Sequence, residues 1–288
     1  MLERKIIDFR PKLSVVEKYS GPNDIKDVLR RACVQRTHWG NGVLLYDSSV
    51  RFGPLVGQVV TADTPLGALR YSLGMYEPDV KKAMLNLAQN GVLKNGSVAY
   101  DIGANIGIHT LALSKLVGSE GRVVSFEPSS ASDVLDINLS QNGITNAQVV
   151  RKAVSDSDGD VPFFLHEYSF GNHIAQVSNE LKKAKKVPEI SIDSFVQQGL
   201  AKPPDFMKID VEGAELQVIQ GAQNTLGRYH PAVIMEVRPE YFQEIENIFR
   251  QRSYTWRLLS GRNSFPYKND TPNYLFIKRE MRRNKGID

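Results

Sequence analysis

The 288-residue chain contains one cysteine, Cys33, and no long apolar run. A single cysteine cannot form an intramolecular disulfide, and it does not provide the several thiolates of a structural zinc site. A membrane-spanning helix needs about 20 consecutive apolar residues, which the sequence lacks, and its first residues are charged rather than apolar like the core of a signal peptide. These absences lead us to expect a cytoplasmic protein without a membrane span.

An excess of charge of one sign is also missing. The chain has 36 Lys and Arg against 32 Asp and Glu residues, and five of the basic residues fall within the last eleven positions. The body of the chain is therefore nearly neutral, so we expect no nucleic-acid partner and interpret residues 281–288 as a solvated basic tail. The hydrophobic share of 41% and the charged share of 24% exclude the disordered and fibrous classes.

The stretch 98–110 predicts a strand, a tight turn and a helix. A short apolar run ends at Asp101, small residues follow, and apolar residues then recur at helical spacing. At Gly103 and Gly107 the missing Cβ allows a sharp turn and a close approach of a ligand to the main chain. We therefore expect this turn to bind a ligand.

The residues of the turn favour one ligand over another. A dinucleotide site uses Gly-x-Gly-x-x-Gly, whereas Asn105 occupies the second glycine position here and the spacing is Gly-x-x-x-Gly. The carboxylate of Asp101 would repel a pyrophosphate and attract a cationic amine, directly or through water. Glu127, at the end of the next strand, can accept hydrogen bonds from a ribose, in NAD as well as in S-adenosylmethionine. Asp101 and Asn105 together favour S-adenosylmethionine.

Strands and helices alternate after residue 97, which predicts an α/β fold with a parallel sheet covered on both faces. Two short strands, 161–165 and 186–190, interrupt the alternation. Before it, residues 1–40 suggest a peripheral helical segment and 42–71 small antiparallel strands. We thus expect a small α+β N-terminal extension over 1–75 and a main domain over 76–280. We expect the extension to modulate the choice of the second substrate, the acceptor, or the assembly of the protein. A chain beginning near Tyr71 should on this view still bind the cofactor.

A third group of charged residues follows a later strand. The segment 208–215 contains Asp210 and Glu212 just before a predicted helix. Either acid could simply cap that helix. The two could also contribute to a magnesium site, but the sequence identifies no third ligand, so no metal is predicted.

Three segments, 98–107 (Val-Ala-Tyr-Asp-Ile-Gly-Ala-Asn-Ile-Gly), 126–128 (Phe-Glu-Pro) and 207–215 (Met-Lys-Ile-Asp-Val-Glu-Gly-Ala-Glu), resemble the FkbM family of S-adenosylmethionine-dependent methyltransferases. The similarity runs from about residue 76 to residue 236. It implies a seven-stranded Rossmann-like methyltransferase sheet whose last strand is antiparallel. It also implies O-methylation of a hydroxyl on a sugar, polyketide or other small metabolite.

The resemblance implies roles for individual residues. It carries cofactor binding onto Asp101, Gly103, Asn105, Gly107 and Glu127 and places Asp210 and Glu212 at the rim of the active site. The segment from Ser169 to Asn172 is similar to the polar loop that precedes the family's substrate region, so these two residues are candidates for binding the acceptor.

Methyl transfer from a sulfonium needs no acid, because the leaving group becomes a neutral thioether. The enzyme must hold the acceptor hydroxyl in line and take its proton. Candidate bases are His173, Asp210 and Glu212, whereas His109, inside the central helix, is interpreted as a packing residue. Two alternatives stay open: a non-catalytic S-adenosylmethionine-binding or scaffolding protein of the same fold, and an NAD-dependent oxidoreductase.

Overall fold

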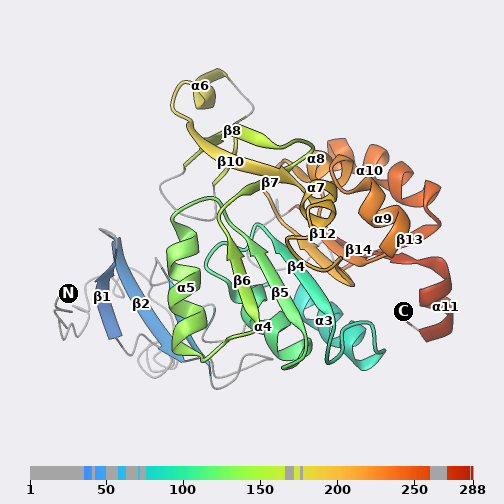
Figure 1. Ribbon diagram of the computed structural model, residues 1–288, viewed down its shortest axis with the longest axis horizontal. Helices are drawn as coiled ribbons and strands as arrows, with labels where there is room; N and C mark the ends of the chain where they lie inside the picture. Colours follow the sequence, from blue (N-terminus) through green and yellow to red (C-terminus); the bar gives the residue numbers. More distant parts are fainter. Residues whose placement is uncertain are drawn as a thin grey trace, which may run out of the picture.

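A computed structural model describes residues 36–40, 43–49, 58–62, 71, 76–165, 172–175, 178–259, 271–285 and 287. Its central feature is a sheet of seven strands in the order β13-β14-β12-β11-β4-β5-β6 (Figure 1). The strands are β4 (Val98–Ile102), β5 (Arg122–Phe126), β6 (Ala147–Val150), β11 (Phe206–Ile209), β12 (Ala232–Glu236), β13 (Tyr254–Leu258) and β14 (Asn273–Lys278). Only β14 runs against its neighbours within this sheet. The predicted seven-stranded sheet is confirmed.

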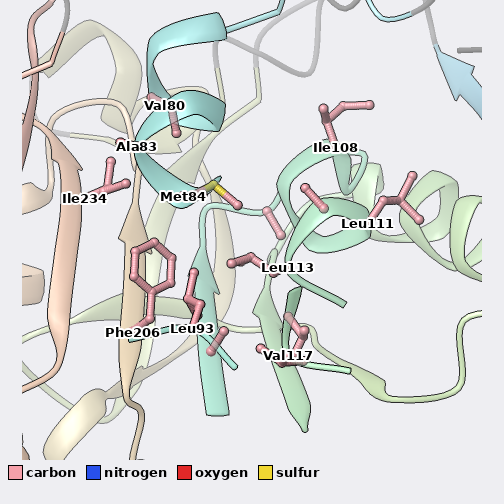
Figure 2. Packing of buried hydrophobic residues seen from close by; sticks show 14 of the residues in the cluster. Val80, Ala83, Met84, Leu93, Ile108, Leu111, Leu113, Val117, Phe206 and Ile234 are labelled. Atoms are coloured by element: carbon pink, nitrogen blue, oxygen red, sulfur yellow. The ribbon is translucent and has the colours of Figure 1, made fainter. Parts of the chain in front are cut away.

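Helices cover both faces of this sheet because its strands alternate between two apolar cores. Ala99 and Phe206 point into the core beneath the helices α3 (Pro78–Gln89), α4 (Ile108–Leu116) and α5 (Ala131–Gln141). Tyr100 and Met207, one position further along, point into the opposite core. Figure 2 shows the first core, where Met84 of α3, Leu113 of α4 and Phe206 of β11 gather. The opposite core is covered by α7 (Ile192–Gln197), α8 (Glu215–Gln220), α9 (Gln223–Tyr229) and α10 (Pro239–Gln251).

The predicted helix over 214–226 is divided in two at Gly221. A Cβ at this residue would lie 2.1 Å from the backbone oxygen of Ser155. The chain therefore approaches β7 (Ala153–Ser155) more closely here than a helix with side chains could, which the helical spacing of the sequence did not reveal.

A smaller sheet interrupts the alternation, as predicted. Its strands, in the order β7-β10-β8-β9, include β8 (Gly159–Phe164), β9 (His173–Ile174) and β10 (Lys185–Ser191), with the short helix α6 (Ser178–Leu181) at its tip. We call the described residues between 156 and 188 the flap; it projects at the top of Figure 1. The flap leaves and rejoins the body through the neighbouring strands β7 and β10.

Three short strands precede the main domain: β1 (Arg36–Gly40), β2 (Val43–Ser49) and β3 (Val59–Ala62), all antiparallel. The helix expected up to residue 40 is wrong for 36–40, which form β1; residues 1–35 lie outside the described part. Val60 and Ala62 of β3 are fully buried in the core beneath α3, α4 and α5. The boundary predicted at residue 75 therefore does not separate two cores.

Side chains of α5 take the place of a neighbouring strand for β3. Asn138 accepts from the backbone N–H of Thr61 at 2.7 Å and donates to its carbonyl at 3.0 Å, and Asn142 does the same for Val59 at 2.9 and 2.7 Å. Asn138 also donates to the carbonyl of Ile106 at 2.7 Å. These bonds tie β3 to the turn that follows β4.

The predicted solvated tail is instead structured at its start. Residues Arg279–Lys285 form α11, and Ile287 is buried in the core with its carbonyl accepting from Arg282.

Among the described residues, no helix combines the length and apolar character needed to cross a membrane.

Candidate active site

A pocket lies at the carboxyl ends of β4, β5 and β11. It falls where the order of the parallel strands reverses, because the chain proceeds outward from β4 to β6 and then returns to β11 beside β4. Ligands of open α/β sheets bind at such a reversal. The pocket is lined by the turn after β4, by the residues that follow β5 and β11, and by parts of the flap.

The glycine turn is sharp, as the sequence predicts, whereas the close approach of a ligand to it stays a prediction. Gly103 and Gly107 have φ angles of +79° and +90°, and Asn105 is also left-handed at +50°. A Cβ at Gly103 would lie 1.8 Å from the backbone oxygen of Asp210, and one at Gly107 would lie 2.1 Å from the Leu135 side chain. The turn is thus packed against the end of β11 on one side and α5 on the other.

Glu127 is buried at the pocket wall with only 6% of its surface exposed. It accepts from the Asn105 N–H at 2.9 Å and from the N–H and hydroxyl of Ser129 at 3.0 and 2.6 Å. Burial raises the pKa of Glu127 even though these hydrogen bonds lower it. Since a carboxylate has about four acceptor positions, one stays available for a ligand. The carboxylate both fixes the turn and presents an acceptor to the pocket.

Asp101 lies beneath the turn, not in the pocket wall. Its side chain is fully buried, and Oδ2 accepts from the Thr110 hydroxyl at 2.7 Å. Because the carboxylate has no exposed surface in this structure, direct contact with the cofactor's ammonium gains no support from it and stays a prediction. Oδ1 has no hydrogen-bond partner among the described residues, so the water-mediated form stays a prediction.

A buried charge cluster forms the floor of the pocket. The ammonium of Lys208 lies 2.8 Å from Oδ2 of Asp210, with only 2% of Lys208 exposed. Burial alone would lower the pKa of Lys208, but the charges of Asp210, Glu77 and Asp101 raise it. Burial likewise acts to raise the pKa of Asp210, and Lys208 reverses this and lowers it. Lys208 and Asp210 are therefore a charged pair at neutral pH.

Two further carboxyl groups adjoin this pair. Carboxyl oxygens of Asp210, Glu212 and Glu236 lie within 4.8 Å of one another. Burial and the Asp210 charge raise the pKa of Glu236 to about 10, so it carries a proton that it shares with Asp210, and they raise the pKa of Glu212 to about 7. Three such carboxyl groups could hold a hard divalent cation, although Lys208 already neutralises Asp210. Glu236 ends β12, so the pattern of acids at strand ends could have identified it.

The protonated state of Glu236 makes stability depend on pH. Its folded pKa of about 10 lies above the ordinary 4.5, so its contribution is complete below pH 4.5 and is lost as the pH rises toward 10. We expect the free energy of unfolding to fall by up to about 1.4 kcal/mol per pH unit within this range. The variant Glu236→Gln can still donate to Asp210 but cannot titrate. Its free energy of unfolding, measured with urea between pH 7 and 9, should therefore fall less steeply with pH than that of the wild type. The exposed Glu240→Gln should keep the wild-type slope; equal slopes in all three proteins would contradict the assignment.

The two described flap residues that the sequence predicted for the site, Asn172 and His173, point in different directions. Asn172 lines the pocket, as does Ile174, but His173 between them does not, because successive residues of a strand point to opposite faces. The His173 imidazole instead lies 3.3 Å from a Glu180 oxygen. His173 thus does not line the pocket, and its role as the base stays a prediction. Ser169 lies outside the described residues.

A different histidine lines the pocket. His109, in the first turn of α4, is 3% exposed, and its Nε2 lies 2.5 Å from Oε2 of Glu77. Glu77 has a left-handed backbone, at φ 40°, just before α3. The sequence interpretation of His109 as a packing residue missed this pair, because its partner is 32 positions away.

This sheet order, with a glycine turn at the strand reversal and a buried acid after the next strand, is that of the S-adenosylmethionine-dependent methyltransferases. Residues 101–255, more than half of the chain, match the family described as "Methyltransferase FkbM domain", and the chain belongs to this family. The chain therefore contains a methyltransferase domain of this S-adenosylmethionine-dependent family, which is not a family of NAD-dependent oxidoreductases.

Other proteins resemble parts of the chain. The hexuronic acid methyltransferase AglP of Haloferax volcanii is 32% identical over 153 residues, which cover 52% of this chain and 58% of AglP. The chain thus matches less than two thirds of that relative's length. Among solved structures, methyltransferase FkbM from Methylobacillus flagellatus KT matches with a TM-score of 0.46 and 16% identity, over 69% of this chain and 55% of that one. A putative methyltransferase from Streptococcus mutans, in complex with SAH, matches with a TM-score of 0.42 and 15% identity. The match covers 69% of this chain and 96% of that one.

The pocket fits S-adenosylmethionine on its own geometry. Gly103 lets the turn lie against the end of β11, Oδ1 of Asn105 is buried without a hydrogen-bond partner among the described residues, and Glu127 keeps an acceptor position. An acceptor of this kind suits a ribose hydroxyl, and an amide oxygen suits an ammonium group.

Proposed function

We propose that this methyltransferase methylates a hydroxyl group of a sugar. The observation that carries the proposal is the lining of the pocket beyond Glu127: Asp210 and Glu212 line the same pocket as Tyr71 and Tyr76, whose rings pack edge to face. Carboxylates accept hydrogen bonds from hydroxyl groups, and aromatic faces cover the apolar C–H surface of a sugar ring. That AglP acts on a hexuronic acid supports the same class.

The residues of the chain would perform three tasks in this reaction. S-adenosylmethionine supplies a methyl group on a positively charged sulfur, whose departure needs no acid. The turn at Gly103 and the carboxylate of Glu127 hold the cofactor, whereas Asp210 and Glu212 orient the acceptor hydroxyl. Holding reacting atoms in line can supply up to about 7–11 kcal/mol of the rate enhancement. The charge of Lys208 keeps Asp210 ionised and fixed in direction.

The proposal is tested with radiolabelled S-adenosylmethionine and three acceptors: p-nitrophenyl β-D-glucuronide, p-nitrophenyl β-D-glucoside and cyclohexanol. Because the lining is acidic, the glucuronide can be methylated only if its carboxylate points away from Asp210 and Glu212. We expect label in at least one glycoside and none in cyclohexanol. Label in cyclohexanol alone would overturn the sugar assignment.

Glu127→Gln should weaken S-adenosylmethionine binding about 10- to 100-fold. The amide loses one acceptor oxygen, so a charge-assisted bond worth about 1.5–3 kcal/mol is lost either to the ligand or to the turn. Isothermal titration calorimetry measures the change, and the exposed Glu240→Gln serves as the control. Affinity within two-fold of wild type, in a folded variant, would remove Glu127 from the cofactor site.

A further inference from the structure

His109 and Glu77 form a buried pair on the pocket wall that the cofactor and acceptor roles above do not use. Nε2 of the imidazole lies 2.5 Å from the Glu77 carboxylate. Nδ1, the other ring nitrogen, is buried and has no hydrogen-bond partner among the described residues. A buried polar atom of this kind costs free energy unless something binds it. The vacant nitrogen therefore indicates a ligand, and the ring that carries it lines the pocket.

The hydrogen bond to Glu77 determines which nitrogen carries the proton. Burial acts to raise the pKa of Glu77, but the hydrogen bond to His109 and the charges of His109 and Lys208 lower it. An ionised carboxylate can only accept, so Nε2 carries the hydrogen. In the neutral ring Nδ1 is then left with a lone pair. This is the arrangement in which a carboxylate orients a histidine base.

We propose that His109, oriented by Glu77, is the catalytic base that takes the proton of the acceptor hydroxyl. The inference rests on the proposed function, since it requires a hydroxyl acceptor. The acceptor O–H bond breaks and its proton goes to Nδ1. The acceptor oxygen forms the new bond to the methyl carbon with an electron pair of its own, while the carbon–sulfur bond breaks and leaves its pair on sulfur.

The other groups around His109 are less suited to this task. Lys208, on β11, is protonated, and Asp210 is held by it. Glu236 on β12 already carries a proton, and Asp101 on β4 lies beneath the turn. The Tyr76 ring, 5.7 Å from the imidazole, has a pKa raised far above neutrality by burial and by the Glu77 charge.

Glu77 acts on the reaction through His109, as a positioning residue. Its backbone is left-handed at φ 40°, a conformation that is unfavourable for a residue with a side chain and persists only where the surroundings hold it. That conformation places the carboxylate between α3 and α4, so the imidazole is fixed from the side opposite its vacant nitrogen.

The first test needs no acceptor. The full chain is labelled with ¹⁵N-histidine, and its five imidazoles are observed by NMR with S-adenosylhomocysteine bound; the signal missing from His109→Gln identifies His109. We expect the Nε2–H tautomer, with Nδ1 unprotonated, near neutral pH. In Glu77→Gln, whose amide no longer requires a donor at Nε2, the Nδ1–H tautomer should appear. An Nδ1–H tautomer in the wild type would overturn the proposal whichever acceptor is correct.

The second test measures turnover of the glycoside that the wild type methylates. His109→Gln keeps a donor for Glu77 but has no basic nitrogen, so kcat should fall at least 100-fold with S-adenosylmethionine affinity within two-fold of wild type. His230→Gln, at the residue that follows α9, is the matched control and should retain wild-type turnover. More than a third of the wild-type kcat in His109→Gln would overturn the proposal. If no glycoside is methylated, the sugar acceptor is wrong and the NMR result alone decides the role of His109.

Discussion

Gly103→Ala should abolish binding of S-adenosylmethionine. The new Cβ would lie 1.8 Å from the backbone oxygen of Asp210, which cannot move as the end of a flexible side chain could. The φ of +79° adds about 1–2 kcal/mol of strain for any residue with a side chain. Relief of the contact would displace the turn from β11 and with it the pocket. Calorimetry should detect no binding at cofactor concentrations that saturate the wild type.

Gly143→Ala separates the two causes. Gly143 is also left-handed, at φ +64°, but a Cβ there would meet nothing within 4 Å. This variant should lose only the strain energy and bind the cofactor normally. If Gly103→Ala bound the cofactor as well as Gly143→Ala, the cofactor site would lie elsewhere.

Removal of residues 1–70 should unfold the chain or leave it strongly destabilised. This result reverses the expectation from sequence that such a chain would bind the cofactor normally. Val60 and Ala62 are fully buried in the main core, and burial of a valine side chain alone contributes about 1.5–3 kcal/mol. Loss of β3 also removes the backbone N–H and carbonyl groups to which the amides of Asn138 and Asn142 are bonded in that strand. The total is a large part of the about 5–15 kcal/mol that stabilises a typical domain.

A chain that begins at residue 57 is the control, because it loses β1 and β2 but keeps β3. Thermal unfolding should show it to be close to the full chain, whereas the chain that begins at Tyr71 should melt at least about 10 °C lower or not fold. Equal melting temperatures for the two truncated chains would show that β3 is dispensable.

Local sequence patterns predicted those parts of the molecule that local interactions decide. Apolar runs, turns and the glycine spacing identified the sheet, the pocket and the wall formed by Glu127. The same patterns could not identify pairs formed across the fold, such as His109 with Glu77. The orientation of His173 depended on the register of a two-residue strand, and no periodicity can be read from so short an element.

The burial of β3 in the main core was hidden from the sequence for a related reason. Composition changes near residue 75, but the partners of β3 are asparagine side chains on α5, about 80 positions away. Nothing in either segment alone marks the pairing. Glu236, in contrast, could have been predicted from the sequence. It ends β12 much as Asp210 follows β11, so applying the same rule about acids at strand ends to β12 would have identified it.

Under the proposed function, the flap would give this protein a route to new acceptors during evolution. Its two ends are neighbours, since Ala153 of β7 pairs with Glu189 of β10, and between them the chain contributes Phe163, Asn172 and Ile174 to the pocket. The entropy of closing a loop between fixed ends grows only slowly with its length. Insertions and deletions in this segment can therefore accumulate in descendants without disturbing the seven-stranded sheet. Acceptor range can diverge in this segment while the glycine turn and Glu127, on another part of the chain, are inherited unchanged.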